Sequence, residues 1–256
     1  MLSLLGLSLL EPAPMAAGAE GMSLSAVREG FTYARSRQEL IGTYVVNFVA
    51  MVFGMPLALF PAVADQLGGG PSALGLLYAA PACGVLVASL ASHWAPRVER
   101  HGLAVMLAVT AWGLAIVAFG FCSTLWPAVA WLAVAGAADA ISGIFRMTIW
   151  NQTIPDALRG RLAGIEMVSY SSGPLLGHVE AGAVAAGFGV TASVISGGVL
   201  CVVGVLARGL WLPKFVRYDA GNGPEPCPDA PGCVMMSNEA PPQTAENREA
   251  GAAPPR

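Results

Sequence analysis

The segment from Ala135 to Glu166 reads AGAADAISGIFRMTIWNQTIPDALRGRLAGIE, and it decides what kind of fold this chain can adopt. Its first half is apolar enough to enter a lipid bilayer, although it carries Asp139. Its second half gathers Asp156, Arg159 and Arg161 into a short charged stretch, after which another apolar run begins. Two apolar runs joined by a charged turn are typical of consecutive membrane-spanning helices.

The composition of the whole chain supports this interpretation. Of its 256 residues, 55% are hydrophobic and 11% are charged, and the mean hydropathy is +0.62. A soluble domain has about 25% charged residues, so this chain lacks the charge needed to cover a globular surface. We therefore predict an all-α polytopic membrane protein with the lipid bilayer as its surroundings. The net charge of −3, without a basic patch, gives no reason to expect a nucleic-acid partner.

Six apolar segments are long enough to cross a bilayer, which takes about 20 residues each. We expect spans near Leu40–Val63, Ser72–Ser92, Leu103–Phe121, Leu125–Phe145, Leu162–Ala185 and Val190–Trp211. The chain then divides into three regions. Residues 1–39 form a helix stub and a cytoplasmic linker, residues 40–217 form a six-helix transmembrane domain, and residues 218–256 form a disordered cytoplasmic tail rich in Pro, Gly and Ala.

The positions of the basic residues test this count independently. Lys and Arg are absent from the links after the first, third and fifth expected spans. They occur before the first span, after the second, after the fourth and after the sixth, at Arg28, Arg35, Arg37, Arg97, Arg100, Arg146, Arg159, Arg161, Arg208, Lys214 and Arg217. Because basic residues collect on the cytoplasmic side, we expect a multi-pass plasma-membrane protein with both flanks of the six-helix domain in the cytoplasm.

The N-terminal MLSLLGLSLL is apolar but too short to cross the bilayer. It could be a signal peptide, but it has no basic n-region, and cleavage would leave Arg28 outside the cell. We interpret it as the inner end of a helix that begins upstream, followed by a linker able to form a surface helix. In the tail, Cys227 and Cys233 match no common zinc or redox spacing.

Acidic residues inside the apolar segments are candidates for a proton or substrate path. An ionised side chain at the centre of a membrane helix costs about 2.5–3.5 kcal/mol, so Asp139, Glu166 and Glu180 need a reason to be there. A structural hydrogen bond to a neighbouring helix is an equally good explanation for Asp139. Arg146 is a further path candidate. It lies about 10 Å from Asp139 along the same helix face, which is too far for a direct ion pair with Asp139 unless the helix bends.

The fifth segment contains SYSSGPLLGHVEAG, in which Gly173 and Pro174 predict a broken helix at membrane depth. Broken helices are where transporters expose backbone groups to their substrates. His178, with an ordinary pKa near 6.5, could share a proton with a nearby acid. Alternatively, His178 and Glu180 lie near the outer interface and are simply hydrated.

The first segment contains GMP, so Pro56 predicts a second helix break. Tyr44 and Asn47 precede this break and share a helix face, where they could line a cavity. For Asn47 we favour a hydrogen bond between helices, worth about 1 kcal/mol.

Sequence motifs for enzymes are absent. The chain has no GxxxxGK[ST] phosphate loop, no GxSxG elbow and no HExxH helix. Its three histidines do not have the spacing of a metal site, and we expect neither a metal nor a cofactor. We therefore predict that the protein is not an enzyme.

Two short loop motifs and two longer stretches resemble the major facilitator superfamily of transporters. PDALRGRLAGIE, residues 155–166, resembles its cytoplasmic link between helices ten and eleven, and HWAPRVERHG resembles a degenerate loop between helices eight and nine. GTYVVNFVAMVFGMPLALFPAVA and the Ala135–Glu166 stretch resemble the enterobactin-exporter-like branch of drug and siderophore exporters. The resemblance covers about residues 23–217.

The resemblance implies the C-terminal six-helix half of a twelve-helix exporter that alternates its access and is driven by protons. It implies that Asp156, Arg159 and Arg161 belong to a charged cytoplasmic latch. The chain would then need its missing N-terminal half, or a second copy, to complete a path for a small-molecule substrate. Alternatively, it is a truncated half-transporter that acts as a membrane scaffold or a homodimer subunit.

Overall fold

The protein is described by a computed structural model that covers residues 32–33, 37–154, 156–211, 213–216 and 218. Over these residues the regular structure is entirely helical, which confirms the predicted all-α class. The predicted helix stub, most of the linker and the tail with Cys227 and Cys233 lie outside the described residues.

The first expected span is built from three pieces: α3 (Gln38–Phe53), η1 (Pro56–Leu59) and α4 (Phe60–Gln66). Pro56 lacks an amide hydrogen and disfavours helical geometry at the residue before it, Met55, which has φ −117° and ψ 79°. The chain therefore leaves the helix between Phe53 and Pro56 and resumes it one short turn later.

The other helices follow with short connections. Their bounds are α5 (Gly70–Leu90), η2 (Ser92–Arg97), α6 (His101–Gly120), α7 (Leu125–Thr153), α8 (Asp156–Phe188), α9 (Val190–Trp211) and α10 (Pro213–Val216). Only Gly189 separates α8 from α9, and its φ of +91° is a conformation that residues with a side chain rarely adopt.

Two expectations about α8 are wrong. Asp156, Arg159 and Arg161 do not form a turn but lie in its first two turns. The helix also continues through Gly173 and Pro174 without interruption. A proline removes only one backbone donor, and a long membrane helix tolerates that loss where neighbours or side chains satisfy the freed group.

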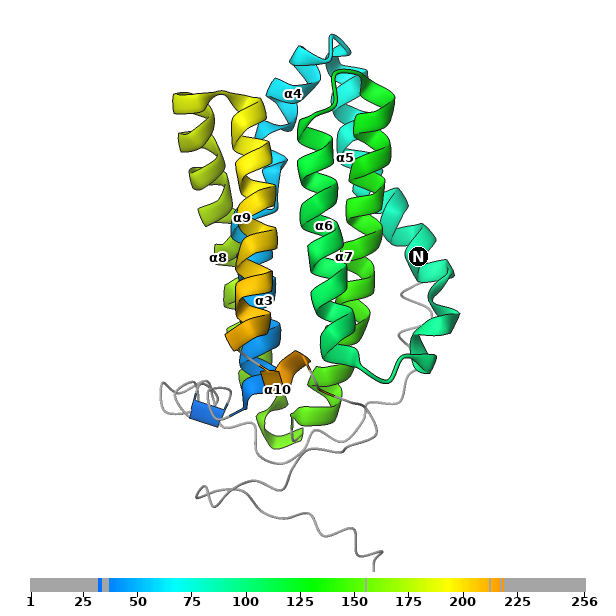
Figure 1. Ribbon diagram of the computed structural model, residues 1–256, viewed down its shortest axis with the longest axis vertical. Helices are drawn as coiled ribbons and strands as arrows, with labels where there is room; N and C mark the ends of the chain where they lie inside the picture. Colours follow the sequence, from blue (N-terminus) through cyan, green and yellow to red (C-terminus); the bar gives the residue numbers. More distant parts are fainter. Residues whose placement is uncertain (1–31, 34–36, 155, 212, 217, 219–256) are drawn as a thin grey trace, which may run out of the picture. The chain divides into compact units, whose positions relative to one another are not determined.

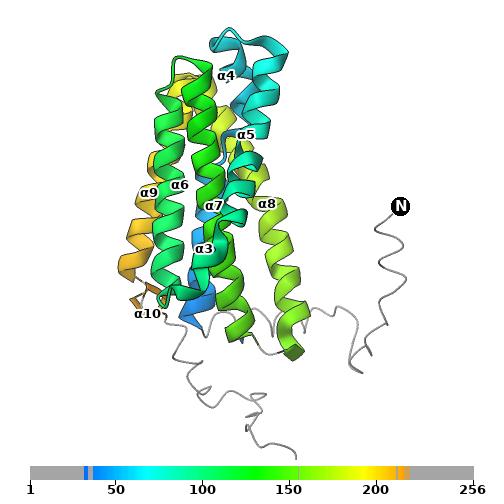
Figure 2. The same ribbon diagram turned by 90° about the vertical axis from the view of Figure 1, so that its right-hand side faces the viewer.

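The helices pack as two groups of three, α5–α6–α7 and α3–α8–α9, which are joined mainly where α6 meets α9 (Figures 1 and 2). The tightest contacts use glycine. A Cβ on Gly84 of α5 would overlap the carbonyl oxygen of Ala133, and one on Gly136 of α7 would overlap the carbonyl oxygen of Pro81. Small residues that allow such close approach are typical of membrane helix interfaces.

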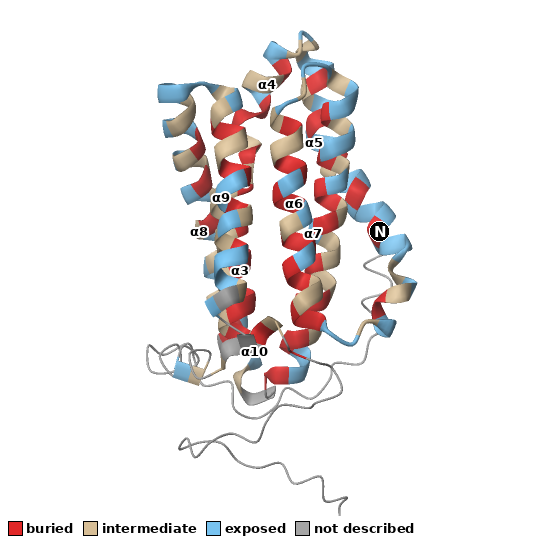
Figure 3. Ribbon diagram, in the orientation of Figure 1, coloured by how far each residue is buried: buried red, intermediate tan, exposed pale blue. Residues whose placement is uncertain are grey.

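Buried residues line the faces that the helices turn toward one another, and exposed residues cover the outer faces (Figure 3). Many of the exposed residues are large and apolar, among them Leu90, Phe188 and Trp211. Exposed apolar area of this extent belongs in lipid rather than water.

Five helical segments are long and apolar enough to cross a membrane: Glu39–Gln66, Gly70–Leu90, His101–Gly120, Leu125–Thr153 and Val190–Gly209. They agree with five of the six expected spans. The sixth expected span corresponds to α8, which has the length but also carries Glu166, His178 and Glu180. The count of six spans therefore stays a prediction.

Candidate functional site

Arg146 of α7 is the centre of a polar cluster inside the bundle. The residue is only 9% exposed. Its Nη1 donates a hydrogen bond to Oδ1 of Asn47 on α3, and its Nη2 lies 3.7 Å from Oδ1 of Asp139. A buried guanidinium is thus held by an amide on one helix and a carboxylate on its own helix.

The pairing with Asp139 corrects the sequence-based expectation that the two residues are too far apart. Helical side chains lean toward the N-terminus of their helix, so the long Arg146 side chain reaches back two turns toward Asp139. Gly143 lies between them, and a Cβ there would be 4.0 Å from Nη2 of Arg146. The guanidinium therefore lies over a part of α7 that has no side chain.

Glu166 and Tyr44 join the same cluster from α8 and α3. Glu166 is close enough to interact electrostatically with Arg146 and with Tyr44. The Tyr44 hydroxyl donates to the carbonyl oxygen of Leu162, 3.4 Å away, and its ring meets the edge of Trp150 at 5.4 Å. Five of the path candidates, from three helices, thus lie near one another.

The cluster is only partly satisfied. Among the described residues, Arg146 Nε and Ser142 Oγ are buried without a hydrogen-bond partner, although Ser142 is only 1% exposed. The Asp139 side chain, in contrast, is 53% exposed. One cation and two carboxylates share the site, and Asp139 is the more exposed of the two acids.

His178 and Glu180 lie elsewhere. They are at least twelve residues beyond Glu166 on α8, about 18 Å along the helix axis. Both are half-buried, and His178 Nε2 is buried without a partner in the part of the chain that the structure describes. The structure therefore does not bring these two path candidates to Arg146.

The glycines of α8 have a packing role beside this cluster. A Cβ on Gly173 would lie 3.0 Å from Cβ of Met51, and one on Gly177 would lie 2.8 Å from the Met51 carbonyl oxygen. Met51 Sδ also accepts a 3.7 Å hydrogen bond from Asn47 Nδ2. Gly173 therefore lets α8 approach α3 closely at Met51, one helical turn after Asn47, the residue that binds Arg146.

The major facilitator superfamily matches residues 43–238, which is most of this sequence. The chain belongs to the major facilitator superfamily. Membership in this family of transporters, together with the apolar helices, makes it a multi-pass membrane protein.

Relatives with curated names are similar over most of this chain. The enterobactin exporter EntS of Citrobacter koseri is 29% identical over 230 residues, which cover 90% of this chain and 54% of the relative. The EntS proteins of Escherichia coli O1:K1 / APEC and Shigella boydii serotype 18 are 28% identical over 207 residues, or 80% of this chain and 49% of each relative. The chain spans about half the length of these relatives. No solved structure matches it.

The end of the bundle that carries Arg97, Arg100 and Arg208 is here called the cationic end. Arg159 is exposed there, and the side chains of Asp156 and Arg161 lie outside the described residues. The latch role of these three residues therefore stays a prediction.

Aromatic residues that the sequence analysis missed make the contacts at this end. The Tyr33 hydroxyl donates to the Thr153 carbonyl oxygen at 2.9 Å. The Tyr218 hydroxyl donates to Oε1 of Gln152 at 3.2 Å and lies 3.4 Å from Oγ1 of Thr153. Phe215 is fully buried and packs where Gly42 and Gly102 have no side chains. The signal was available, because Tyr33 and Tyr218 flank the apolar domain at its two boundaries.

We expect Tyr218→Phe to lower the free energy of unfolding by about 1 kcal/mol, because the variant keeps the ring and loses its hydrogen bonds to the end of α7. Equilibrium unfolding in mixed micelles measures the change. Tyr170→Phe is the control, because Tyr170 is exposed. An equal effect of both variants would contradict a specific contact at Tyr218.

Proposed function

We propose that the chain is one half of an inner-membrane exporter that moves a small molecule, such as a drug or siderophore, out of the cell in exchange for protons. Superfamily membership supports a transport function, and the relatives named as enterobactin exporters support export of a siderophore-like cargo. In this proposal the flanks of the helical domain lie in the cytoplasm, as the basic residues at the cationic end favour.

The observation that carries the proposal is the Asp139–Arg146–Asn47 cluster. A transporter that exchanges protons for cargo needs an ionisable group inside the membrane whose two protonation states bind different partners. When the Asp139 carboxylate is ionised, it attracts Arg146 and any donor group of the cargo. When it takes up a proton, it releases both, so the proton and the cargo compete for one exposed carboxylate.

Arg146 and Asn47 have a different role in this scheme. Arg146 is buried and held by Asn47, so its positive charge stays in place through the exchange. A fixed cation beside Asp139 and Glu166 offsets the charge of whichever carboxylate is ionised. The two helices that the hydrogen bond joins, α3 and α7, would then respond together to the proton.

The length of the relatives supports a requirement for a partner. The chain covers about half of each, and a single helical half offers one wall of a path between two halves. We propose that a separate six-helix half, or a second copy of this chain, supplies the other wall. The alternative is a half-transporter that assembles in the membrane without transporting, as a scaffold or a homodimer subunit.

Transport assays on Asp139→Asn test the function. Proteoliposomes holding the chain, alone or with a co-expressed N-terminal half, are given a pH gradient, and movement of enterobactin and of protons is followed. We expect Asp139→Asn to lose proton-coupled movement by about tenfold or more while it still inserts and folds, because an amide cannot carry a proton through the cycle.

Two results would contradict the proposal. Unchanged coupling in Asp139→Asn would reduce Asp139 to a packing residue. Failure of the unaltered chain to move any cargo in either combination would favour the scaffold, and cross-linking in native membranes would then show whether it is a homodimer. Glu180→Gln is the matched control, because it removes an acid that lies away from Arg146.

A further inference from the structure

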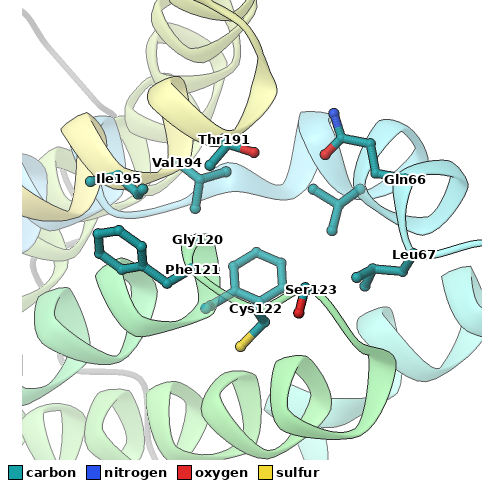
Figure 4. A pocket seen from close by; sticks show the side chains of 11 residues that line it. Gln66, Leu67, Gly120, Phe121, Cys122, Ser123, Thr191, Val194 and Ile195 are labelled. Carbon is teal, nitrogen blue, oxygen red and sulfur yellow. The ribbon is translucent and has the colours of Figure 1, made fainter.

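A cavity of about 390 Å³ lies at the end of the bundle opposite the cationic end, between α4, α6 and α9 (Figure 4). It is lined by Val63, Gln66, Leu67, Phe119, Gly120, Phe121, Cys122, Ser123, Thr191, Val194 and Ile195. Its volume falls within the range of about 300–1,000 Å³ that is usual for small-molecule sites.

The cavity follows from the way α6 and α9 meet. The two helices touch at Gly120, where a Cβ would lie 2.6 Å from Cγ1 of Ile195. Immediately afterwards α6 ends, and the chain continues through Cys122 and Ser123 in non-helical geometry before α7 begins. The end of α4 lies on the other side, so an open cavity remains between the three helix ends.

This cavity is separate from the polar cluster around Arg146. None of its lining residues belongs to α7 or α8, the helices that carry Asp139, Arg146 and Glu166. Asp139 also lies fourteen residues, about 21 Å, along α7 from the helix end nearest the cavity. A molecule in the cavity would therefore contact none of the charged residues proposed for transport.

The residues that line the cavity are uncharged. Its apolar residues include the buried Phe119 and Val194, and no lining residue carries a formal charge that could offset an ionised ligand. Hydrogen-bonding groups stand on both sides of the opening, with Gln66 and Thr191 on one side and Ser123 on the other (Figure 4). An apolar body and one or two neutral polar groups fit this arrangement.

We propose that the cavity binds an uncharged amphiphile, whose alkyl or aromatic body enters between α6 and α9 and whose hydroxyl or amide group bonds to Gln66, Ser123 or Thr191. The opening lies at one end of membrane helices, so such a molecule can arrive from water or from the bilayer. A bound molecule would lie between the start of α9 and the end of α4, and it would therefore set the distance between these two helices.

The reactivity of the Cys122 thiol can be used to measure whether the cavity is occupied. Its thiol lines the cavity and donates a 3.3 Å hydrogen bond to the Ala118 carbonyl oxygen. Burial raises the pKa of the Cys122 thiol above its ordinary value, so labelling is done at a fixed alkaline pH. The full chain with Cys83→Ser, Cys201→Ala, Cys227→Ser and Cys233→Ser retains Cys122 alone and is placed in lipid nanodiscs free of neutral detergent.

The measurement is the rate of N-ethylmaleimide labelling with three probes of equal chain length: 1-octanol, octanoate and octylammonium. We expect 1-octanol to slow labelling of Cys122 severalfold at concentrations at which the two charged probes have little effect. The matched control is a variant with Cys83 as the sole cysteine, because Cys83 is exposed on the outside of α5. Its labelling should not respond to 1-octanol.

Variants of the lining separate the site from general effects on the bilayer. Thr191→Val or Ser123→Ala should weaken the protection by 1-octanol about fivefold, the effect of one lost hydrogen bond. Val194→Trp should fill the space and remove the response altogether. Protection that also occurs with dioleoylglycerol built into the nanodisc would identify the bilayer as a source of the ligand.

Three outcomes would overturn the proposal. One is equal protection by octanoate or octylammonium, which would mean that the cavity does not select for neutral molecules. Another is equal protection of Cys83, which would mean that 1-octanol acts through the lipid. The last is a response to 1-octanol that persists unchanged in all three lining variants.

Discussion

Arg146→Met is expected to lower the free energy of unfolding by about 2 kcal/mol, because a hydrogen bond made by a buried charged group contributes about 1.5–3 kcal/mol. The substitution leaves the Asn47 amide oxygen buried without its donor and removes the cation near Asp139 and Glu166. Equilibrium unfolding in mixed micelles, followed by circular dichroism, measures the loss. Transport by the same variant should be abolished.

The two partners of the pair should differ in their effects. The Asp139 side chain is about half exposed whereas Arg146 is buried, so Asp139→Asn should cost only about 1 kcal/mol. In the double variant Asp139→Asn/Arg146→Met, residue 139 no longer carries a charge that lacks its cation. The double variant should therefore lose less unfolding free energy than the sum of the two single losses. Equal losses for the two single variants, or strict additivity, would contradict an Arg146-centred cluster.

The sequence predicts the membrane class and most of the helices because these depend on local composition. Five of the six expected spans have a counterpart among the segments able to cross a membrane. The break before Pro56 could also be located, because a proline restricts its own residue and the one before it wherever it occurs. Such features need no knowledge of the neighbouring helices.

The pairing of side chains could not be predicted in the same way. Spacing along α7 correctly separates Asp139 and Arg146 by about 10 Å, but it does not show that the Arg146 side chain extends back over Gly143. Nor does it show that Asn47, nearly a hundred residues earlier, would accept the hydrogen bond from Arg146. These contacts depend on how α3 lies against α7, which is a property of the tertiary packing.

The boundary between α7 and α8 was misjudged for a physical reason. A charged stretch between apolar runs was interpreted as a turn, yet α7 runs to Thr153 and α8 begins at Asp156. Helices extend beyond the apolar layer when their residues favour helical geometry, as Leu and Arg do. Hydropathy marks where lipid ends, and it does not mark where a helix ends.

Substituting alanine for Gly84 or Gly136 is the other change with a large expected effect. A Cβ at either position would overlap backbone atoms of the facing helix, and backbone cannot move aside as a flexible side chain can. We expect each variant to lose about 3 kcal/mol or more of unfolding free energy, at or above the upper end of the cost of overpacking.

Gly75→Ala is the matched control for this experiment. Gly75 lies on the same helix as Gly84, but a Cβ there has no atom within 4 Å. Because alanine favours a helix over glycine by about 1 kcal/mol, the control should be neutral or slightly stabilising. If Gly84→Ala unfolds no more easily than Gly75→Ala, then α5 and α7 do not pack through these glycines. The position of α7, and with it that of Asp139 and Arg146, would then depend on other packing contacts.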